Sequence, residues 1–538
     1  MSHPFRGGFR RAACLAALPL VLGLASPTAR AETTLRLVPQ ADLKILDTVW
    51  TTNNITSNHG YMVYDVLFAP DGKLAYKPEM VDAYEKSADG LTWKFTLRAG
   101  LKFHDGTPVG AKDVVATIQR WGKRIPVGVT LMQFTKEVVA TGPASFEIHL
   151  AQPFGPVLDA LGTPENPLFI TREKEAMLPP DQPLDDPTGS GPYIMVKNEW
   201  IPGAKVVYRK NPDYVPRAEP ADGFAGGKVA KVDRVEWPVI PDANTATQAL
   251  IRGEVDMIEI PTTDMLPLMR KEGHIVIKVI DKIGTQGVMR PNHLQKPFDN
   301  PKIRQALLYL VGNQKDYLGA QIGNAEFERP CWAVFVCGTP LESKAGIGPW
   351  ATNSNEANLV KAKELLKEGG YKGERIVVLD PTDAHLAHAP ATVTAQKMRE
   401  AGMNVDLQAV DWGTQTARRA LKDPLDSNPR AWHVFHTWGG GLAQGTPITN
   451  AGVPAPCDGK NWFGWPCDEQ LEKIRLEYPL AATDAQRKDI IDRLQARYYE
   501  VVPYIPTGIF FAPVAYRDNV SGVLDTVRLV LWNIEKKG

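Results

Sequence analysis

This 538-residue sequence lacks an excess of charge of either sign, because its 61 Lys and Arg residues balance its 61 Asp and Glu residues. A neutral chain lacks the concentrated basic surface that phosphate binding needs, so we predict no nucleic-acid partner. Long apolar runs are missing beyond the N-terminus, which excludes a membrane-spanning helix there. Apolar residues still make up 43% of the chain, and its length predicts two or three lobes.

Catalytic and cofactor motifs are missing as well. The chain contains no P-loop, no G-x-G-x-x-G, no G-x-S-x-G and no H-E-x-x-H. Two histidine pairs, His385 with His388 and His433 with His436, have a spacing that on a helix could present both rings to one metal. Neither pair has a Cys or a carboxylate at metal-site spacing, and 432–436 has the pattern of a strand, which separates its histidines. We therefore predict no cofactor, no metal and no enzymatic activity.

Cysteine is scarce, with five in the chain, and one of these lies in the N-terminal segment. The other four allow three complete pairings, and their spacing favours two local ones. Cys457 and Cys467 enclose a short segment with turn residues at both ends, and Cys331 and Cys337 lie six residues apart. A zinc site would need a C-x2-C pair or a neighbouring histidine pair, and neither occurs, so we predict two disulfides.

The first 31 residues have the three parts of a secretory signal peptide. Three arginines precede an apolar run at 12–25, and the segment ends in the small-residue pattern Ala29-Arg30-Ala31. The pair Arg10-Arg11 leaves twin-arginine export open beside the general secretory route. Cleavage after Ala31 leaves 57 basic and 61 acidic residues, a net charge of −4. We predict an exported, mildly acidic mature protein.

Hydrophobic periodicity indicates a mixed α/β protein. Residues 91–98 alternate apolar and polar strictly, which predicts a half-buried strand, and 111–121 have the pattern of a helix. Apolar residues at 61–68 have helical spacing. Further along, the pattern is strand (376–379), helix (390–401), strand (405–410), which predicts a right-handed crossover between parallel strands.

Polar and aromatic residues follow the strands of this crossover. Asp380-Pro-Thr-Asp383 comes after the first strand, at the edge where open α/β sheets place ligand groups, although helix-capping carboxylates explain the same pattern. Trp412 and Trp438 each follow an apolar, strand-like run. Core packing and the lining of a cleft both account for these indoles.

Five segments, in order along the chain, carry a family resemblance: LTWKFTLRAGLKFHDGTPV at 91–109, GSGPY at 189–193, RKNPDY at 209–214, GEVDM at 253–257 and PFDNPKIRQAL at 297–307. They resemble the family 5 extracellular solute-binding proteins, the receptors of dipeptide, oligopeptide and nickel ABC importers. The resemblance covers essentially all of the mature chain. It implies that the 91–109 segment serves the fold and the surface, and not the pocket.

The resemblance implies an α/β fold of the periplasmic-binding-protein type, with two hinged lobes plus an extra inserted domain. Domain I would be discontinuous over 32–58, 188–281 and 505–538, domain II would be the insertion 59–187, and domain III would span 282–504. The implied function is that of a periplasmic receptor, a monomer that captures a solute between closing lobes. Its partners would be this solute and the permease subunits of an ABC importer in the inner membrane.

Site residues follow from the resemblance position by position. Trp412 and Trp438 match two tryptophans that line the pockets of peptide-binding relatives. In those relatives an aspartate three residues after the second Trp anchors the α-ammonium of the peptide, and Gly441 stands there in this chain. Three successive glycines would also leave room beside Trp438. The ligand-binding residues that we predict are Trp50, Asn53, Asp383, His385, Trp412, Trp438, Gly439, Gly440 and Gly441.

The charged anchors for a peptide with free termini are therefore missing. Dipeptide receptors place a carboxylate-binding arginine near the end of the strand before the crossover helix, where this chain has the segment from Asp380 to His385. We predict a small organic solute or a peptide-like ligand. Ordinary di- or oligopeptides and metal chelates are alternatives within the binding proteins. A secreted hydrolase that uses Asp383 and His385 is the alternative from another class, but no nucleophile with a base and oxyanion donors is recognisable.

Overall fold

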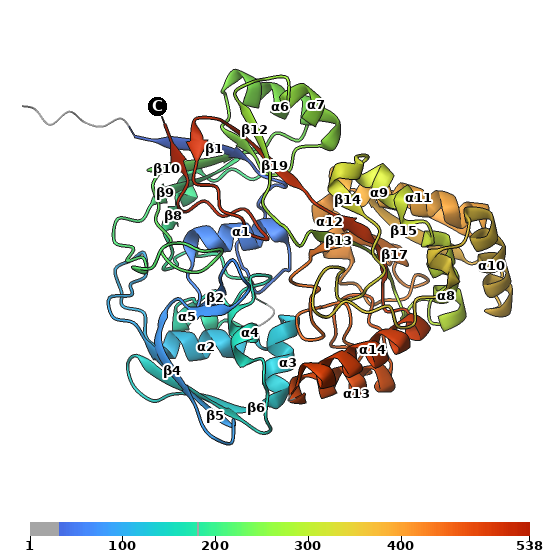
Figure 1. The fold of residues 1–538 in the computed structure, drawn as a ribbon, viewed down its shortest axis with the longest axis horizontal. Coiled ribbons are helices and arrows are strands. Elements are labelled where there is room, and N and C mark those ends of the chain that lie inside the picture. The colour runs from blue at the N-terminus through green and yellow to red at the C-terminus, as the bar shows by residue number, and fades with distance from the viewer. Residues whose placement is uncertain (1–31, 180–181, 482, 538) are drawn as a thin grey trace, which may run out of the picture. The chain divides into compact units, whose positions relative to one another are not determined.

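The computed structural model describes residues 32–179, 182–481 and 483–537, which contain both helices and strands throughout (Figure 1). The predicted signal peptide at 1–31 lies outside the described residues. In the described ranges, no helix is long and apolar enough to cross a membrane. The helices are α1 (Asn54–Val63), α2 (Ala111–Trp121), α3 (Pro126–Phe134), α4 (Val157–Gly162), α5 (Glu173–Ala176), α6 (Ala243–Arg252), α7 (Leu266–Met269), α8 (Pro301–Val311), α9 (Gln314–Gln321), α10 (Asn355–Glu368), α11 (His385–Glu400), α12 (Trp412–Arg418), α13 (Glu469–Glu477) and α14 (Asp484–Val501).

A seven-stranded sheet joins segments that are far apart in the sequence. Its order is β12 (Ile275–Val279), β19 (Pro513–Arg517), β11 (Met257–Ile258), β1 (Thr34–Val38), β10 (Arg234–Pro238), β9 (Lys205–Lys210) and β8 (Tyr193–Met195). The central strand β1 pairs in parallel with β10 and with β11. Leu35 and Leu37 of this strand are buried in one apolar cluster with residues of α1 and of the C-terminal segment. The two ends of the described chain therefore meet in one core.

A six-stranded sheet contains the predicted crossover. Its order is β14 (Glu328–Arg329), β18 (Ile505–Phe510), β13 (Thr285–Pro291), β17 (Val434–Gly440), β15 (Arg375–Pro381) and β16 (Asn404–Val410). Strands β15 and β16 are parallel and α11 connects them, as predicted. The side chains from Ile376 to Leu379 have no exposed surface, which is typical of a parallel strand covered on both faces.

A four-stranded antiparallel sheet holds the 91–109 segment. Its order is β4 (Val81–Lys86), β5 (Thr92–Leu97), β7 (Ser145–Leu150) and β6 (Thr135–Ala140). Trp93, Phe95 and Leu97 of β5 are buried, and the residues between them are exposed, which confirms the predicted half-buried strand. Helix α2 has the predicted bounds, and its N-terminus is capped where Asp113 accepts a hydrogen bond from the backbone N–H of Gly110 at 2.8 Å. Two pairs of short strands complete the sheets, β2 (Phe68–Pro70) with β3 (Tyr76–Pro78) and β20 (Val520–Ser521) with β21 (Glu535–Lys536).

Two helix predictions were wrong in their bounds. The crossover helix begins at His385, and Pro390, where it was expected to begin, is its sixth residue. A proline inside a helix removes one backbone hydrogen bond, and here the helix continues past it. The helix expected at 61–68 is α1, which begins at Asn54 and ends at Val63. Every residue of α1 from Ile55 onward is buried, and a helix buried all round has no polar stripe that marks its start.

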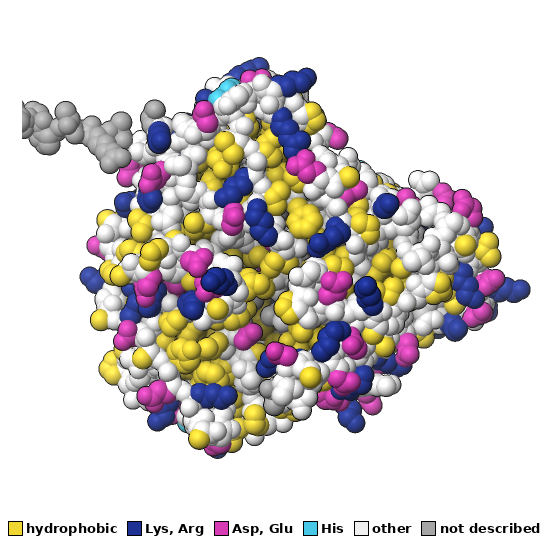
Figure 2. Space-filling view, in the orientation of Figure 1, with side chains coloured by type: hydrophobic (Ala, Val, Ile, Leu, Met, Phe, Trp, Pro, Cys, Tyr) yellow, Lys and Arg dark blue, Asp and Glu magenta, His cyan; other side chains and the backbone are white. Residues whose placement is uncertain are grey.

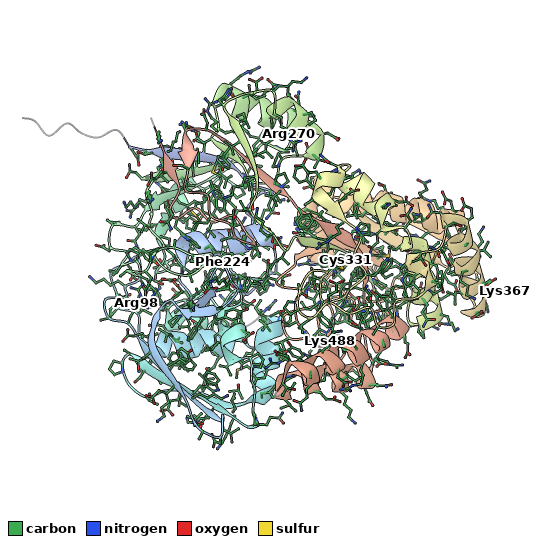
Figure 3. All side chains as sticks on the ribbon, in the orientation of Figure 1. Arg98, Phe224, Arg270, Cys331, Lys367 and Lys488 are labelled. Atoms are coloured by element: carbon green, nitrogen blue, oxygen red, sulfur yellow. A yellow bond between two sulfur atoms is a disulfide. The ribbon has the colours of Figure 1, made fainter. Side chains whose placement is uncertain are left out.

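Both predicted disulfides are present. Cys331 pairs with Cys337 and Cys457 pairs with Cys467. Figure 3 labels Cys331, which packs beside Ile509 of the six-stranded sheet. The domain boundaries implied by the resemblance stay predictions. The three larger sheets do accompany three apolar clusters of their own, which is the arrangement expected of separate lobes.

Candidate functional site

A cavity of about 730 Å³ opens between two walls that belong to different sheets. One wall is made by residues within 38–45, 52–56 and 239–263, which adjoin the seven-stranded sheet and α1. The facing wall is made by residues within 383–386, 411–419 and 437–444, which adjoin the six-stranded sheet. No residue of the 91–109 segment lines it, in agreement with the role that the resemblance implies. The size and the mixed lining are typical of a site for a small molecule.

The two predicted tryptophans lie together on the second wall. The rings of Trp412 and Trp438 are stacked, with centroids 5.0 Å apart and planes 21° from parallel. Trp412 is the first residue of α12, and its backbone N–H donates to Asp383 at 2.6 Å. Trp438 is near the end of β17, opposite Gly287 of β13. Both rings line the cavity and both are only half-buried, so the pair presents one flat aromatic surface.

The three glycines after Trp438 do not leave free space. A Cβ at Gly439 would lie 2.2 Å from the Gln444 side chain, and one at Gly440 would lie 2.3 Å from the Glu165 carboxylate. Gly441 is packed against Ile283, whose Cγ2 would lie 2.4 Å from an added Cβ. Of the three, Gly439 alone is among the lining residues. The expected room is therefore filled by neighbouring side chains.

The remaining predicted residues separate into two groups. Asp383, His385 and Asn53 line the cavity, and the first two are exposed at its edge. His385 begins α11, and Asn53 is the residue before α1. Trp50 does not line the cavity; its ring lies under the Arg124 guanidinium, 4.5 Å from centroid to carbon.

The histidine pairs are engaged within the protein. His388 contacts the Asp380 carboxylate at 2.5 Å, and His436 contacts the Thr394 hydroxyl at 2.8 Å. His433 accepts from the Val377 N–H at 3.0 Å. Burial lowers the pKa of His433 to about 4 and that of His436 to about 3, so both rings are neutral at physiological pH. Within the described ranges no group of three or more His, Cys, Asp and Glu residues could hold a metal ion.

A buried charged network below the first wall was not found from the sequence. The Arg528 guanidinium donates to Glu165 at 2.5 Å and to Asn58 at 3.0 Å, and Asn58 donates to Glu259 at 2.6 Å. Burial raises the pKa of Glu259. Glu165 also lines the cavity. The only sequence signal was an acid within the apolar run Met-Ile-Glu-Ile at 257–260, and such a signal does not reveal its partner.

Arg419 is a second functional candidate that sequence reasoning missed. It follows α12, lines the cavity and is only 3% exposed. Its guanidinium lies 4.6 Å from the centroid of Phe463 and 5.7 Å from that of Trp462. Burial lowers the pKa of Arg419 to about 10, which still leaves the group protonated at neutral pH.

Comparison with known proteins places this site in a class of binding proteins. Residues 75–438 match the family model described as bacterial extracellular solute-binding proteins, family 5 Middle. The probable peptide ABC transporter periplasmic-binding protein y4tO of Sinorhizobium fredii is 35% identical over 534 residues, which cover 99% of this chain and 98% of that protein. The glutathione-binding protein GsiB of Escherichia coli O157:H7 is 25% identical over 521 residues, with 94% and 95% covered.

Solved structures agree on the fold. The binding protein AgaA from A. tumefaciens R10, in complex with agropinic acid, superposes with a TM-score of 0.78 at 20% identity and covers 94% of this chain and 99% of its own. A dipeptide-binding protein from Pseudoalteromonas sp. SM9913, in complex with Met-Leu, has a TM-score of 0.75 at 19% identity, with 94% and 100% covered. The chain belongs to the bacterial extracellular solute-binding proteins, family 5, which confirms the resemblance seen in the sequence.

Proposed function

We propose that this chain is the periplasmic receptor of an ABC importer and that it captures one small organic or peptide-like solute between its two cavity walls. The observation that carries the proposal is the stacked pair of Trp412 and Trp438 on one wall of a 730 Å³ cavity. A flat aromatic surface, half-exposed to a cavity, offers a large apolar contact with little loss of side-chain entropy. The solute then passes to permease subunits in the inner membrane.

Closure of the two walls couples binding to delivery. Two polar contacts cross between them: the ammonium of Lys44 lies 3.7 Å from Asp411, and Arg419 donates to Thr52 at 3.2 Å. A solute that contacts both walls favours the closed arrangement over the open one by its difference in affinity for the two. A permease that recognises the closed arrangement therefore receives loaded receptors. In this role the chain binds its solute unchanged, and we expect it to do so as a monomer.

The hydrolase alternative is poorly supported. His385 makes no side-chain hydrogen bond to any residue in the described part of the chain. One carboxylate oxygen of Asp383, Oδ1, already accepts from the Trp412 N–H. A hydrolytic site needs a nucleophile held against a base and donors for the oxyanion. The cavity offers a surface for binding instead.

The solute is not expected to be held by a free α-ammonium. Two of the four lining carboxylates are paired with a cation: Glu165 accepts from Arg528, and Asp411 lies 3.7 Å from the Lys44 ammonium. Asp42 and Asp383 each accept one backbone N–H, from Gly203 and Trp412. Gly441 offers no carboxylate, since it has no side chain. Burying an unpaired ammonium costs several kcal/mol, so a peptide with free termini would bind well only if Asp42 or Asp383 replaced the missing carboxylate.

Calorimetry with unmodified di- and tripeptides tests this expectation. We expect affinities no better than the micromolar range, and no loss of affinity when the N-terminus of each peptide is acetylated. Submicromolar binding of several peptides that acetylation abolishes would show that the ammonium is anchored, and would contradict the proposed ligand class.

A further inference from the structure

Arg419 differs from the other buried arginines in what it binds. Arg120, Arg172, Arg475 and Arg528 each pair with a carboxylate, and Arg290, Arg304 and Arg418 each donate to two or more backbone carbonyls. Among the buried arginines of the described ranges, Arg419 alone has neither kind of acceptor. Its one hydrogen bond goes to the Thr52 hydroxyl.

Arg419 has a donor that no described residue uses. Its Nε is buried without a partner among the described residues, and the side chain is one of those that line the cavity. The rings of Phe463 and Trp462 hold the guanidinium in place through cation–π contacts. A desolvated guanidinium with unfilled donors is costly unless a ligand supplies acceptors. Arg430, also at the lining, is exposed and has no salt bridge in the described part of the chain, so it adds a second positive charge nearby.

We propose that Arg419 is the anion-binding group of this cavity and that the solute carries a carboxylate which pairs with its guanidinium. The planar fork of an arginine matches the two oxygens of a carboxylate. The inference deepens the proposed function and rests on it. It places the carboxylate-binding group just after α12, whereas the resemblance to dipeptide receptors pointed to the end of β15, where this chain has no arginine.

The position of Arg419 also sets the shape of the solute. Arg419 comes seven residues after Trp412 and continues the helical backbone of α12 with φ −60° and ψ −17°. Residues seven apart share one face of a helix and lie about 10 Å apart along its axis. The solute therefore has an apolar or planar part, stacked on the tryptophan pair, and a separate acidic group that reaches Arg419. The contact with Thr52 of the opposite wall lets the same anion favour closure.

N-acetyl dipeptides and the matching N-acetyl dipeptide amides are the probes, because they differ only in the carboxylate. We expect the wild type to bind the acids at least tenfold more tightly than the amides, and Arg419→Met to abolish this preference. Arg418→Met is the matched control: Arg418 is also buried, but it donates to the carbonyls of Arg430 and Ala431 and does not line the cavity. This control should retain the preference, with a lower melting temperature.

Iodide provides a second readout that needs no organic solute. Crystals soaked in sodium iodide should show an ion at the Arg419 guanidinium in the wild type and none in Arg419→Met. An empty guanidinium in the wild type, equal binding of acids and amides, or an acid preference that survives in Arg419→Met would each overturn the inference. Iodide at Arg419 without binding of any organic solute, acidic or neutral, would support the anion site and contradict the receptor function.

Discussion

At the scale of single residues, the assignment of the two tryptophans to the cleft depended on the family resemblance. Trp412 and Trp438 could be assigned to a cleft only by position, because core packing explained the same apolar surroundings. The structure places both rings on the cavity, yet Trp438 also packs against the apolar cluster around Ile258 and Leu318. The wall that carries the two rings is therefore partly apolar core and partly cavity surface.

Replacing either tryptophan by alanine should weaken solute binding by about 1–3 kcal/mol, the loss typical of an aromatic anchor. Calorimetry with the natural solute or an N-acetyl dipeptide measures the change. Trp93→Ala is the control, since this buried indole belongs to the four-stranded sheet and does not line the cavity. It should lower the melting temperature and leave affinity unchanged. A loss of stability without a loss of affinity in Trp412→Ala would mean that its ring serves packing alone.

Asp281 should make stability depend on pH. This buried residue lies just before domain III as the resemblance defines it, and burial raises the pKa of its carboxyl to about 6. Between the usual pKa of an aspartate near 4 and this value, the folded chain keeps a proton that the unfolded chain has lost, so stability falls as the pH rises. Asp281→Asn keeps an acceptor for the N–H groups of Ile283 and Gly284.

Urea unfolding of the wild type and of Asp281→Asn at pH 4 and pH 7 measures this effect. From the lower to the higher pH, the wild type should lose on the order of 2 kcal/mol relative to the variant. Equal pH dependence of the two proteins would show that the carboxyl is not held protonated by the fold.

At the scale of elements, the sequence predicted individual helices and strands better than the contacts between segments that are distant in the chain. Strand β5, helix α2 and the β15–α11–β16 crossover followed from periodicity, because each alternates or turns with one buried face. Helix α1 did not, since it is buried all round. The cavity residues Thr52, Glu165 and Arg419 come from separate segments whose meeting depends on tertiary packing, and no local pattern encodes such a meeting. The sequence therefore predicted part of the wall beside the six-stranded sheet and, of the facing wall, Asn53 alone.

The loop closed by the disulfide between Cys457 and Cys467 contributes a side chain to the site. It carries Trp462, which lines the cavity and lies under Arg419. Cys457→Ser with Cys467→Ser should cost about 2–3 kcal/mol of stability by the loop-entropy relation and also weaken binding, because Trp462 loses its restraint. Denaturant titration and calorimetry measure the two effects.

The second disulfide provides a matched control for that experiment. Cys331→Ser with Cys337→Ser opens a loop of similar size away from the cavity, so stability should fall by a similar amount while affinity stays the same. Equal affinity of both double variants would show that the 457–467 loop does not shape the site.

At the scale of the whole molecule, the sheets are assembled from interleaved chain segments. The seven-stranded sheet takes strands from 34–38, from 193–279 and from 513–517, so the chain passes repeatedly between the two sides of the cavity. In the proposed receptor these crossings would act as the hinge between the two walls, and the solute would be enclosed where the walls meet. Figure 2 shows Lys and Arg side chains interspersed with Asp and Glu on the face in view, so no basic patch for a polyanion gathers there.

The central claim is that one solute is bound, unchanged, in the cavity against the tryptophan pair. Mass spectrometry of the small molecules released from protein purified without unfolding tests it most directly. We expect a single acidic organic solute at one equivalent per chain, retained by the wild type and lost from a variant with Trp412→Ala and Trp438→Ala. Retention of the same solute by that variant, or release of a chemically altered product, would contradict the account.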